Sequence, residues 1–196
     1  MVDHFVHHGN PEGIGFWALL REDFATNGRE LSAPGFRAIA VHRLGNARMQ
    51  VRSKLLRAPL SLLYRRLYRW VRNVYGIELP YTVKLGRRVA IDHQSGIVIH
   101  GATELGDDVR IRQNVTMGVR TVDDLYGAPV IGNGVDVGAG AVILGRVQIG
   151  DRAVIGANAV VLDDVPAGAL AVGVPARVVV REPDEQTSTS TERPAR

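Results

Sequence analysis

The stretch IGNGVDVGAGAVILGRVQIGDRAVIGANAVVLDDV, residues 131–165, carries an aliphatic residue at every sixth position. A small or β-branched residue follows each of them four positions later. An α-helix cannot bury this pattern on one face, because six steps of roughly 100° turn each successive side chain by about a third of a turn. A chain that forms one short strand and one tight corner every six residues can bury all of these positions. The predicted fold class is therefore mainly β, a left-handed parallel β-helix of hexapeptide repeats with three strands to a coil.

The same pattern extends back to Leu85 with two interruptions. The aliphatic series consists of Leu85, Ile91, Leu105, Ile111, Met117, Ile131, Val137, Ile143, Ile149, Ile155 and Val161. The second series consists of Val89, Ser95, Val109, Val115, Val135, Ala141, Val147, Ala153, Ala159 and Val165. Phase slips of two residues separate Ile91 from Leu105 and Met117 from Ile131. Because insertions in a solenoid emerge as loops on one face, often the binding face, the slips indicate where functional residues gather.

Glycine follows the aliphatic residue in several repeats, where a corner needs little side-chain bulk or a positive φ. These glycines are Gly86, Gly106, Gly132, Gly138, Gly150 and Gly156. An ordinary α/β domain would need helices between its parallel strands. No helical pattern follows Pro80. The repeats therefore favour the β-helix over an α/β domain.

The chain before the repeats predicts a small α-helical N-terminal region over residues 1–76, followed by the β-helix over 77–181. Helical periodicity extends from Gly15 to Tyr75, and its last segment, Leu55 to Val74, is expected to begin around Pro59. That segment is basic, which predicts a solvated face or, alternatively, peripheral contact with acidic headgroups or a lipid-linked acceptor. Residues 182–196, EPDEQTSTSTERPAR, lack apolar content and predict a disordered tail.

Composition narrows the class of protein. The 196 residues include 24 basic and 20 acidic side chains and no cysteine, which excludes disulfides, thiolate catalysis and thiolate metal sites. No apolar run has the length of a membrane span and no export signal is visible, so a cytoplasmic protein is expected. No nucleic-acid recognition motif accompanies the positive charge, so nucleic acid is not an expected partner.

The first slip contains the residues that suggest chemistry. Asp92 and His93 stand in IDHQSGIVI, residues 91–99, among core aliphatic residues. Glu78 precedes His93 by fifteen residues, close to the roughly eighteen residues of one coil. Stacked coils bring residues one coil apart into contact, so Glu78 is predicted to face the imidazole. A carboxylate on one ring nitrogen fixes the tautomer and supports the imidazolium that forms when the other nitrogen takes a proton.

Four stretches carry a resemblance to a known family. KLGRRVAIDHQSGIVI (84–99), VRIRQNVTMG (109–118), GAGAVILGRVQIGDRAVIGANAVVL (138–162) and VPAGALAVGVPARVVV (165–180) resemble the serine acetyltransferase group of hexapeptide-repeat acyltransferases. GFRAIAVHRLGN (35–46) is similar to that family's helical region. The resemblance implies that His93 is the general base that takes the proton from an acceptor hydroxyl as it attacks the thioester of acetyl-CoA. Glu78 stands where the family has aspartate.

The resemblance also implies a cofactor site and an assembly. Acetyl-CoA would lie in the groove between two β-helices of a homotrimer, with its pantetheine arm past Gly118, Ala139 and Ala157. Arg177 would meet the CoA phosphates or pack against a terminal helix. Flat faces of aliphatic and small residues on a β-helix also favour a threefold ring that covers them. No metal is implied.

The acceptor follows from where the chain departs from the family. Serine acetyltransferases carry a loop ending in Arg-His-Pro, whose cations receive the serine carboxylate. Here the loop reads GVRTVDDLYGAPVI, 118–131, with Gly127 and Ala128 in those places. A carboxylate without a cationic partner binds weakly, although Arg120 could compensate. The exopolysaccharide branch, similar to the colanic acid acetyltransferase, combines the same core with a short basic helical region.

We therefore expect acetyl transfer to a sugar hydroxyl of exopolysaccharide or glycan biosynthesis. Four residues are candidate hydrogen-bonding groups for a polyhydroxylated acceptor: Asp92, Asp123, Asp124 and Tyr126. Serine O-acetylation in cysteine biosynthesis is the alternative. A zinc enzyme on three histidines is disfavoured, because the coils contain only His93 and His100. A non-catalytic scaffold would leave the Asp-His motif and both slips unexplained.

Overall fold

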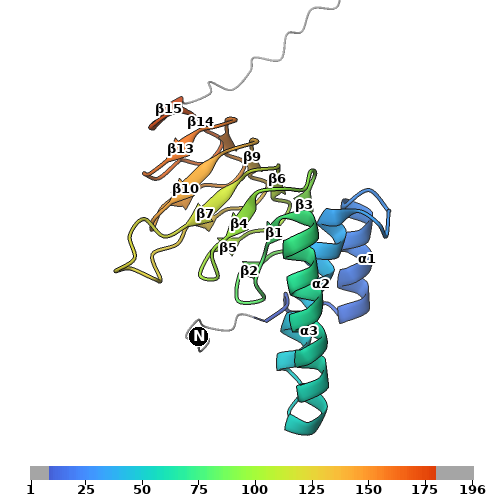
Figure 1. Cartoon of the computed structure of the whole chain (residues 1–196). Coiled ribbons are helices and arrows are strands. Elements are labelled where there is room, and N and C mark those ends of the chain that lie inside the picture. The colour runs from blue at the N-terminus through green and yellow to red at the C-terminus, as the bar shows by residue number, and fades with distance from the viewer. Residues whose placement is uncertain (1–8, 180–196) are drawn as a thin grey trace, which may run out of the picture.

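A computed structural model describes residues 9–179, which form three helices followed by a β-helix (Figure 1). The helices are α1 (Phe16–Thr26), α2 (Pro34–Met49) and α3 (Lys54–Tyr75). Among the described residues, no helix combines the length and apolar character that crossing a membrane requires. The predicted disordered tail, 182–196, lies outside the described residues.

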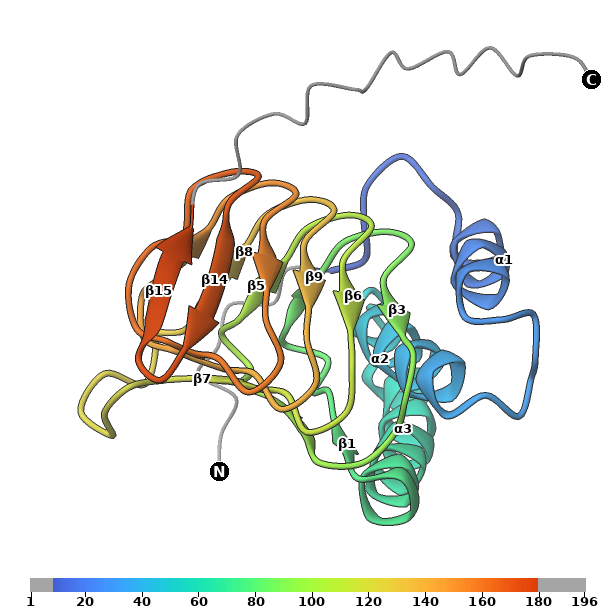
Figure 2. The same cartoon turned by 90° about the horizontal axis from the view of Figure 1, so that it is seen from above.

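The β-helix consists of short strands on three faces. The strands are β1 (Ile77–Glu78), β2 (Lys84–Leu85), β3 (Ala90–Ile91), β4 (Ile97–Ile99), β5 (Glu104–Leu105), β6 (Arg110–Ile111), β7 (Thr116–Gly118), β8 (Val130–Ile131), β9 (Asp136–Val137), β10 (Val142–Leu144), β11 (Gln148–Ile149), β12 (Val154–Ile155), β13 (Val160–Val161), β14 (Leu170–Gly173) and β15 (Ala176–Val179). Sheet A has the order β1-β4-β7-β10-β13, sheet B β11-β8-β5-β2, and sheet C β15-β14-β12-β9-β6-β3. Figure 2 shows strands of sheet C side by side. The predicted left-handed parallel β-helix is confirmed, with β15 as an antiparallel addition.

Strand pairing locates the two phase slips. Val98 pairs with Thr116 and Val142 with Val160, so a regular coil has eighteen residues. Ala90 pairs with Arg110, twenty positions on, which places two extra residues between β3 and β4. Thr116 pairs with Val142, twenty-six positions on, so the loop after β7 adds eight residues. The second insertion is thus a hexad longer than the expected slip of two, because a whole extra hexad leaves the phase unchanged.

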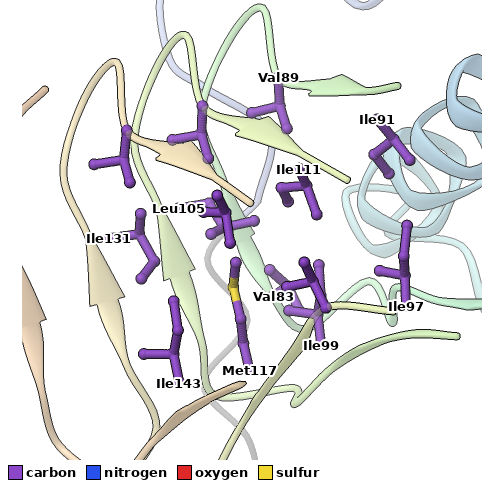
Figure 3. Close-up of a cluster of buried hydrophobic side chains, with 14 of the residues drawn as sticks. Val83, Val89, Ile91, Ile97, Ile99, Leu105, Ile111, Met117, Ile131 and Ile143 are labelled. Carbon is purple, nitrogen blue, oxygen red and sulfur yellow. The ribbon is translucent and has the colours of Figure 1, made fainter. Parts of the chain in front are cut away.

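The aliphatic series forms the core (Figure 3). Every residue of that series is at most 6% exposed, and Ile111, Met117 and Ile143 are fully buried. Burial of each large aliphatic side chain stabilises the fold by about 1.5–3 kcal/mol. The second series is buried as well, except that Ser95 is exposed and lies in the corner between β3 and β4. That exception follows from the first insertion.

The glycines after the aliphatic residues serve close stacking and not a positive φ. A Cβ on Gly86 would lie 2.3 Å from the carbonyl oxygen of Gly106, and one on Gly138 would lie 2.6 Å from the nitrogen of Ala157. Positive φ values occur at other corner positions, such as Gly96 and Gly140. Of the two reasons expected for glycine at these positions, the need for a small residue is therefore the one that applies.

The helical region is fixed to the first coil by buried polar side chains of α2. Arg43 is fully buried, with its Nε 3.0 Å from Asp23 Oδ2 and its Nη1 donating to the carbonyl of Leu85 at 2.9 Å. His42 Nε2 lies 3.0 Å from the carbonyl oxygen of Val83. Burial raises the pKa of Asp23 against the lowering effect of the Arg43 hydrogen bond. The motif GFRAIAVHRLGN therefore joins helices to β-helix.

Helix α3 begins earlier than expected. It starts at Lys54, so Pro59 lies inside the helix and not at its beginning. A proline removes only one donor to the carbonyl four residues before, so the flanking hydrogen bonds can continue the helix. Tyr64 and Val71 are the buried residues of α3, and they face α2 and the first coil.

Candidate active site

His93 lies at the exposed corner between β3 and β4. It lines a hollow of about 430 Å³ together with Asn27, Pro34 and Asp92, so the connection between α1 and α2 forms the opposite wall. Gly96 shapes this corner, because its φ is 63° and a Cβ there would lie 2.3 Å from Asn114 Oδ1. The glycine of the Asp-His motif is thus required by its positive φ and by close packing on the next coil, and His93 is exposed at the same corner.

Asp92 forms an ion pair across two coils. Its Oδ2 lies 3.2 Å from Arg110 Nη1, and the Arg110 side chain is 55% exposed. An exposed pair of this kind contributes little to stability, so Asp92 can exchange this partner for another at small cost. Its predicted contact with an acceptor stays a prediction.

Glu78 lies in a different hollow from His93. It pairs with Val98 on sheet A and lines a hollow of about 850 Å³ with Tyr68, His100 and Gly118. Burial raises the pKa of Tyr68, and the Glu78 carboxylate, which accepts a hydrogen bond from its hydroxyl, raises it further.

The stacking that was expected to bring Glu78 beneath His93 is not observed. The backbone N–H of Ser95 donates to the carbonyl of Tyr75 at 2.8 Å, so the end of α3 lies beneath the corner. Within residues 9–179 of one chain, no hydrogen bond or ion pair joins Glu78 to His93. The two extra residues of the corner displace His93 along the coil. The catalytic pair therefore stays a prediction.

His100 lines the same hollow as Glu78. From the sequence, it was named only in the argument against a zinc site. Burial lowers its pKa, so the imidazole is neutral at neutral pH. The backbone N–H of Ala102 donates to its Nδ1 at 3.4 Å. Strand alternation is the signal that could have identified it, since it places Val98 and His100 on the same outer face of sheet A. Across residues 9–179, no cluster of three acidic or histidine side chains could hold a metal ion.

The loop between β7 and β8 is tied by a bidentate ion pair to the corner between β10 and β11 on the next coil. Arg146 donates through Nε and Nη2 to the carboxylate of Asp124 at 2.8 and 2.7 Å. This hydrogen bonding lowers the pKa of Asp124. A Cβ on Gly127 would lie 2.1 Å from Asp124 Oδ2, and Ala128 is only 6% exposed. At the two positions that the resemblance assigns to cations, Gly127 therefore packs against the Asp124 carboxylate and Ala128 is buried, so neither presents a cation.

The remaining loop candidates differ in their surroundings. Asp123 and Tyr126 are exposed. Arg120 is exposed and lines a third hollow, of about 600 Å³, with Asp124 and Arg146. In the part of the chain that the structure describes, Arg120 has no carboxylate within ion-pair distance. Arg120 is therefore accessible to an anionic group, and its contact with an acceptor stays a prediction.

The predicted CoA contacts fall at three places. Ala139 and Ala157 stack at one corner between sheets C and A, where the N–H of Asn158 donates to the carbonyl of Ala139 at 2.8 Å. Gly118 ends β7 at the opposite edge of sheet A. Arg177 is exposed on β15, which pairs antiparallel with β14, and its expected contact with the CoA phosphates or a terminal helix stays a prediction. The structure brings together only Ala139 and Ala157.

Comparison with known proteins adds to this geometry. Residues 128–163 match the family model of bacterial transferase hexapeptide repeats. The serine acetyltransferase of Helicobacter pylori J99 is 40% identical over 167 residues, which cover 84% of this chain and 94% of that protein. The chain belongs to the serine acetyltransferase family. The predicted resemblance is thereby confirmed, and the family makes the chain an O-acetyltransferase.

Other family members extend the comparison. The Escherichia coli K12 protein WcaB, whose assigned role is that of a colanic acid biosynthesis acetyltransferase, is 41% identical over 130 residues, covering 66% of this chain and 78% of that one. Soybean serine acetyltransferase complexed with serine has a TM-score of 0.70 at 32% identity, covering 84% of this chain and 69% of that one. Brucella abortus serine acetyltransferase in complex with coenzyme A has a TM-score of 0.69 at 29% identity, covering 83% and 66%. These relatives support a CoA thioester as the acyl donor. They favour serine, the alternative acceptor, over a sugar, and the sugar reading is unconfirmed.

Proposed function

We propose that this chain is an acetyl-CoA-dependent O-acetyltransferase that acts on L-serine, with His93 as general base and the cytoplasm as its place of action. The observation that carries the proposal is the open position of His93 at a corner that Gly96 shapes, in a chain of the serine acetyltransferase family. An exposed imidazole is able to reach an acceptor hydroxyl without any movement of the β-helix.

The proposed reaction is direct transfer. His93 takes the proton of the acceptor hydroxyl while its oxygen attacks the thioester carbonyl of acetyl-CoA. The tetrahedral oxyanion is stabilised by backbone N–H groups at the coil edge. The C–S bond then breaks, and the imidazolium returns the proton to the leaving thiolate. Free CoA and the O-acetyl ester are the products, and no cysteine nucleophile is required.

We further propose that the site forms between subunits of a homotrimer. Glu78 and His93 line different hollows of one chain, so a second copy is needed to bring such groups together. The outer face of sheet A carries the apolar side chains of Val98, Val142, Leu144 and Val160, and Val98 is 43% exposed. A threefold ring would cover this face and create three equivalent clefts.

A sugar hydroxyl is the second candidate acceptor, and one observation favours it. The loop that would carry cations for a serine carboxylate contains Gly127 packed on Asp124, and Asp124 is already paired with Arg146. Asp123 and Tyr126 are exposed in the same loop, where a neutral acceptor can contact them. The relatives that are named serine acetyltransferases support serine as the acceptor, whereas the composition of this loop supports a sugar hydroxyl.

A coupled assay separates the two acceptors. Purified protein is incubated with acetyl-CoA, and released CoA is followed with a thiol reagent in the presence of L-serine or of nucleotide sugars and oligosaccharides. Turnover with serine that is lost in His93→Ala supports the proposal. Turnover with a sugar alone, again lost in His93→Ala, transfers the function to glycan biosynthesis. Absence of turnover with every acceptor would contradict both.

A further inference from the structure

The hollow between α3 and sheet A is lined by a buried cation that forms no ion pair with any carboxylate of the described residues. Arg48, near the end of α2, lines the 850 Å³ hollow together with Tyr64, Tyr68, Glu78 and His100. Figure 1 shows α3 beside β1 and β4, the elements between which this hollow lies. Arg48 is only 9% exposed.

The contacts of the Arg48 side chain are with neutral groups. Its guanidinium lies between two aromatic rings, 4.5 Å from the centroid of Tyr64 and 4.4 Å from that of Tyr81. Nη1 donates to Ser61 Oγ at 3.0 Å, and the buried Nε has no hydrogen-bond partner. Among residues 9–179, no carboxylate lies within ion-pair distance of Arg48. A buried charge in this state is costly unless a ligand or partner compensates it.

Arg43 provides the contrast within the same helix. It is fully buried as well, but it binds Asp23 and the carbonyl oxygens of Leu85 and Gly86. Arg43 therefore has a complete structural role, whereas the polar contacts of Arg48 stop at one serine hydroxyl. The difference points to a function for Arg48 beyond holding the fold.

The other charged groups of the hollow do not neutralise Arg48. Glu78 accepts a hydrogen bond from the hydroxyl of Tyr68. Arg65 also lines the hollow and adds a second positive charge, with its Nε donating to the carbonyl of Ser61. Because the two rings cover the faces of the Arg48 guanidinium, a ligand meets it at its edge, which is the geometry of an oxyanion bound by arginine.

We propose that this hollow binds the anionic group of the acceptor, a carboxylate or a phosphate, with Arg48 as its cation. The inference rests on the proposed O-acetyltransferase function, and it supplies the cation that the loop at Gly127 and Ala128 lacks. The hollow also contains Gly118 and Glu78, two of the predicted site residues. An acceptor anchored here by its anion would hold its hydroxyl near them, and the His93 that takes its proton would belong to a second copy of the chain in the proposed trimer.

The test is direct binding without turnover. L-serine and inorganic pyrophosphate are each titrated by calorimetry into the wild-type protein and into Arg48→Met, which keeps an unbranched apolar stem between the two rings. We expect one of the probes to bind and its affinity to fall about tenfold or more in the variant. Serine binding identifies a carboxylate, and pyrophosphate binding identifies a phosphate. Arg72→Gln, on the exposed side of α3, is the matched control and should change the affinity less than twofold.

Two outcomes overturn the inference: neither probe binds the wild-type protein, or affinity is unchanged in Arg48→Met. Because Arg48 packs on two tyrosines, the melting temperature and CoA binding of the variant are measured first. If Arg48→Met does not fold, Arg48→Lys takes its place, and loss of the bidentate geometry should still weaken binding several-fold. If turnover depends on His93 but acceptor KM is the same in the Arg48 variant, this inference alone is wrong. If probe binding depends on Arg48 but no acceptor is turned over, only the proposed enzymatic function is wrong.

Discussion

Gly127 packs directly on Asp124, so that a Cβ at position 127 would lie 2.1 Å from Asp124 Oδ2. The contact exists because Arg146 holds the Asp124 carboxylate from the other side. Glycine at this position therefore allows the contact between the loop backbone and Asp124, in addition to leaving the position without a charge.

Gly127→Ala should disturb this loop and leave the β-helix intact. The new methyl group displaces Asp124 from Arg146, and we expect acceptor KM to rise at least several-fold while CoA binding is unchanged. Asp124→Ala combined with Gly127→Ala removes the clash, so part of the effect should disappear in the double variant. If the effect of the double variant equals the sum of the effects of Asp124→Ala and Gly127→Ala, the contact between the two residues is unimportant.

His93→Ala should abolish transfer without loss of fold. Removal of a general base lowers turnover about 10²- to 10⁴-fold. Because His93 is exposed at a corner and lies outside the aliphatic core, the melting temperature should change little. The measurement is CoA release at saturating acetyl-CoA, with His100→Asn as the comparison variant. If His100→Asn loses more turnover than His93→Ala, the base has been assigned to the wrong histidine.

Asp23→Ala should destabilise the junction between helices and β-helix. It leaves Arg43 as a buried and unpaired charge, which costs about 3–5 kcal/mol of the free energy of unfolding. Urea unfolding followed by circular dichroism measures this loss. Glu22→Ala, which breaks the partly exposed pair with Arg87 beside it, should cost below about 1 kcal/mol. Similar losses in both variants would contradict a special role for the buried pair.

Gly138→Ala should destabilise the stack of coils. Its Cβ would lie 2.6 Å from the backbone nitrogen of Ala157, and backbone cannot move aside as a flexible side chain can. Overpacking of this kind costs about 1–3 kcal/mol. Gly15→Ala is the control, since a methyl group there would meet no atom within 4 Å and the φ of Gly15 is negative. Thermal melting of the two variants provides the comparison.

His100 should titrate with a pKa below the ordinary value of 6.5. Burial lowers its folded pKa, so between the two pKa values the unfolded chain binds the proton and the folded chain does not. The stabilising contribution is therefore fully present above 6.5 and is lost as pH falls through the lowered folded pKa. An NMR titration of the imidazole measures the midpoint, and His100→Asn should remove this part of the dependence of the melting temperature on pH. A midpoint above 6.5 would show that a carboxylate, with Glu78 the nearest candidate, outweighs burial.

Some of the site was accessible from the sequence and some was not. The insertion beside Asp92 and His93 was predictable, since the phase slip there is visible in the sequence and the strand pairing confirms it. The expected contact between Glu78 and His93 was inferred from a fixed coil length, and the corner insertion alters that length for this one coil. Arg48 gave no signal, because in the sequence it is one arginine among many.

The sequence by itself determined the β-helix, its core residues and the family, because a six-residue period is a local property that each repeat expresses independently. Tertiary structure decided which residues share a hollow, since that depends on the number of residues inserted between stacked coils. It also decided that Asp124 forms an ion pair with Arg146, while Arg48 forms no ion pair among the described residues. Pairings of this kind join residues far apart in the chain, and no local pattern contains them.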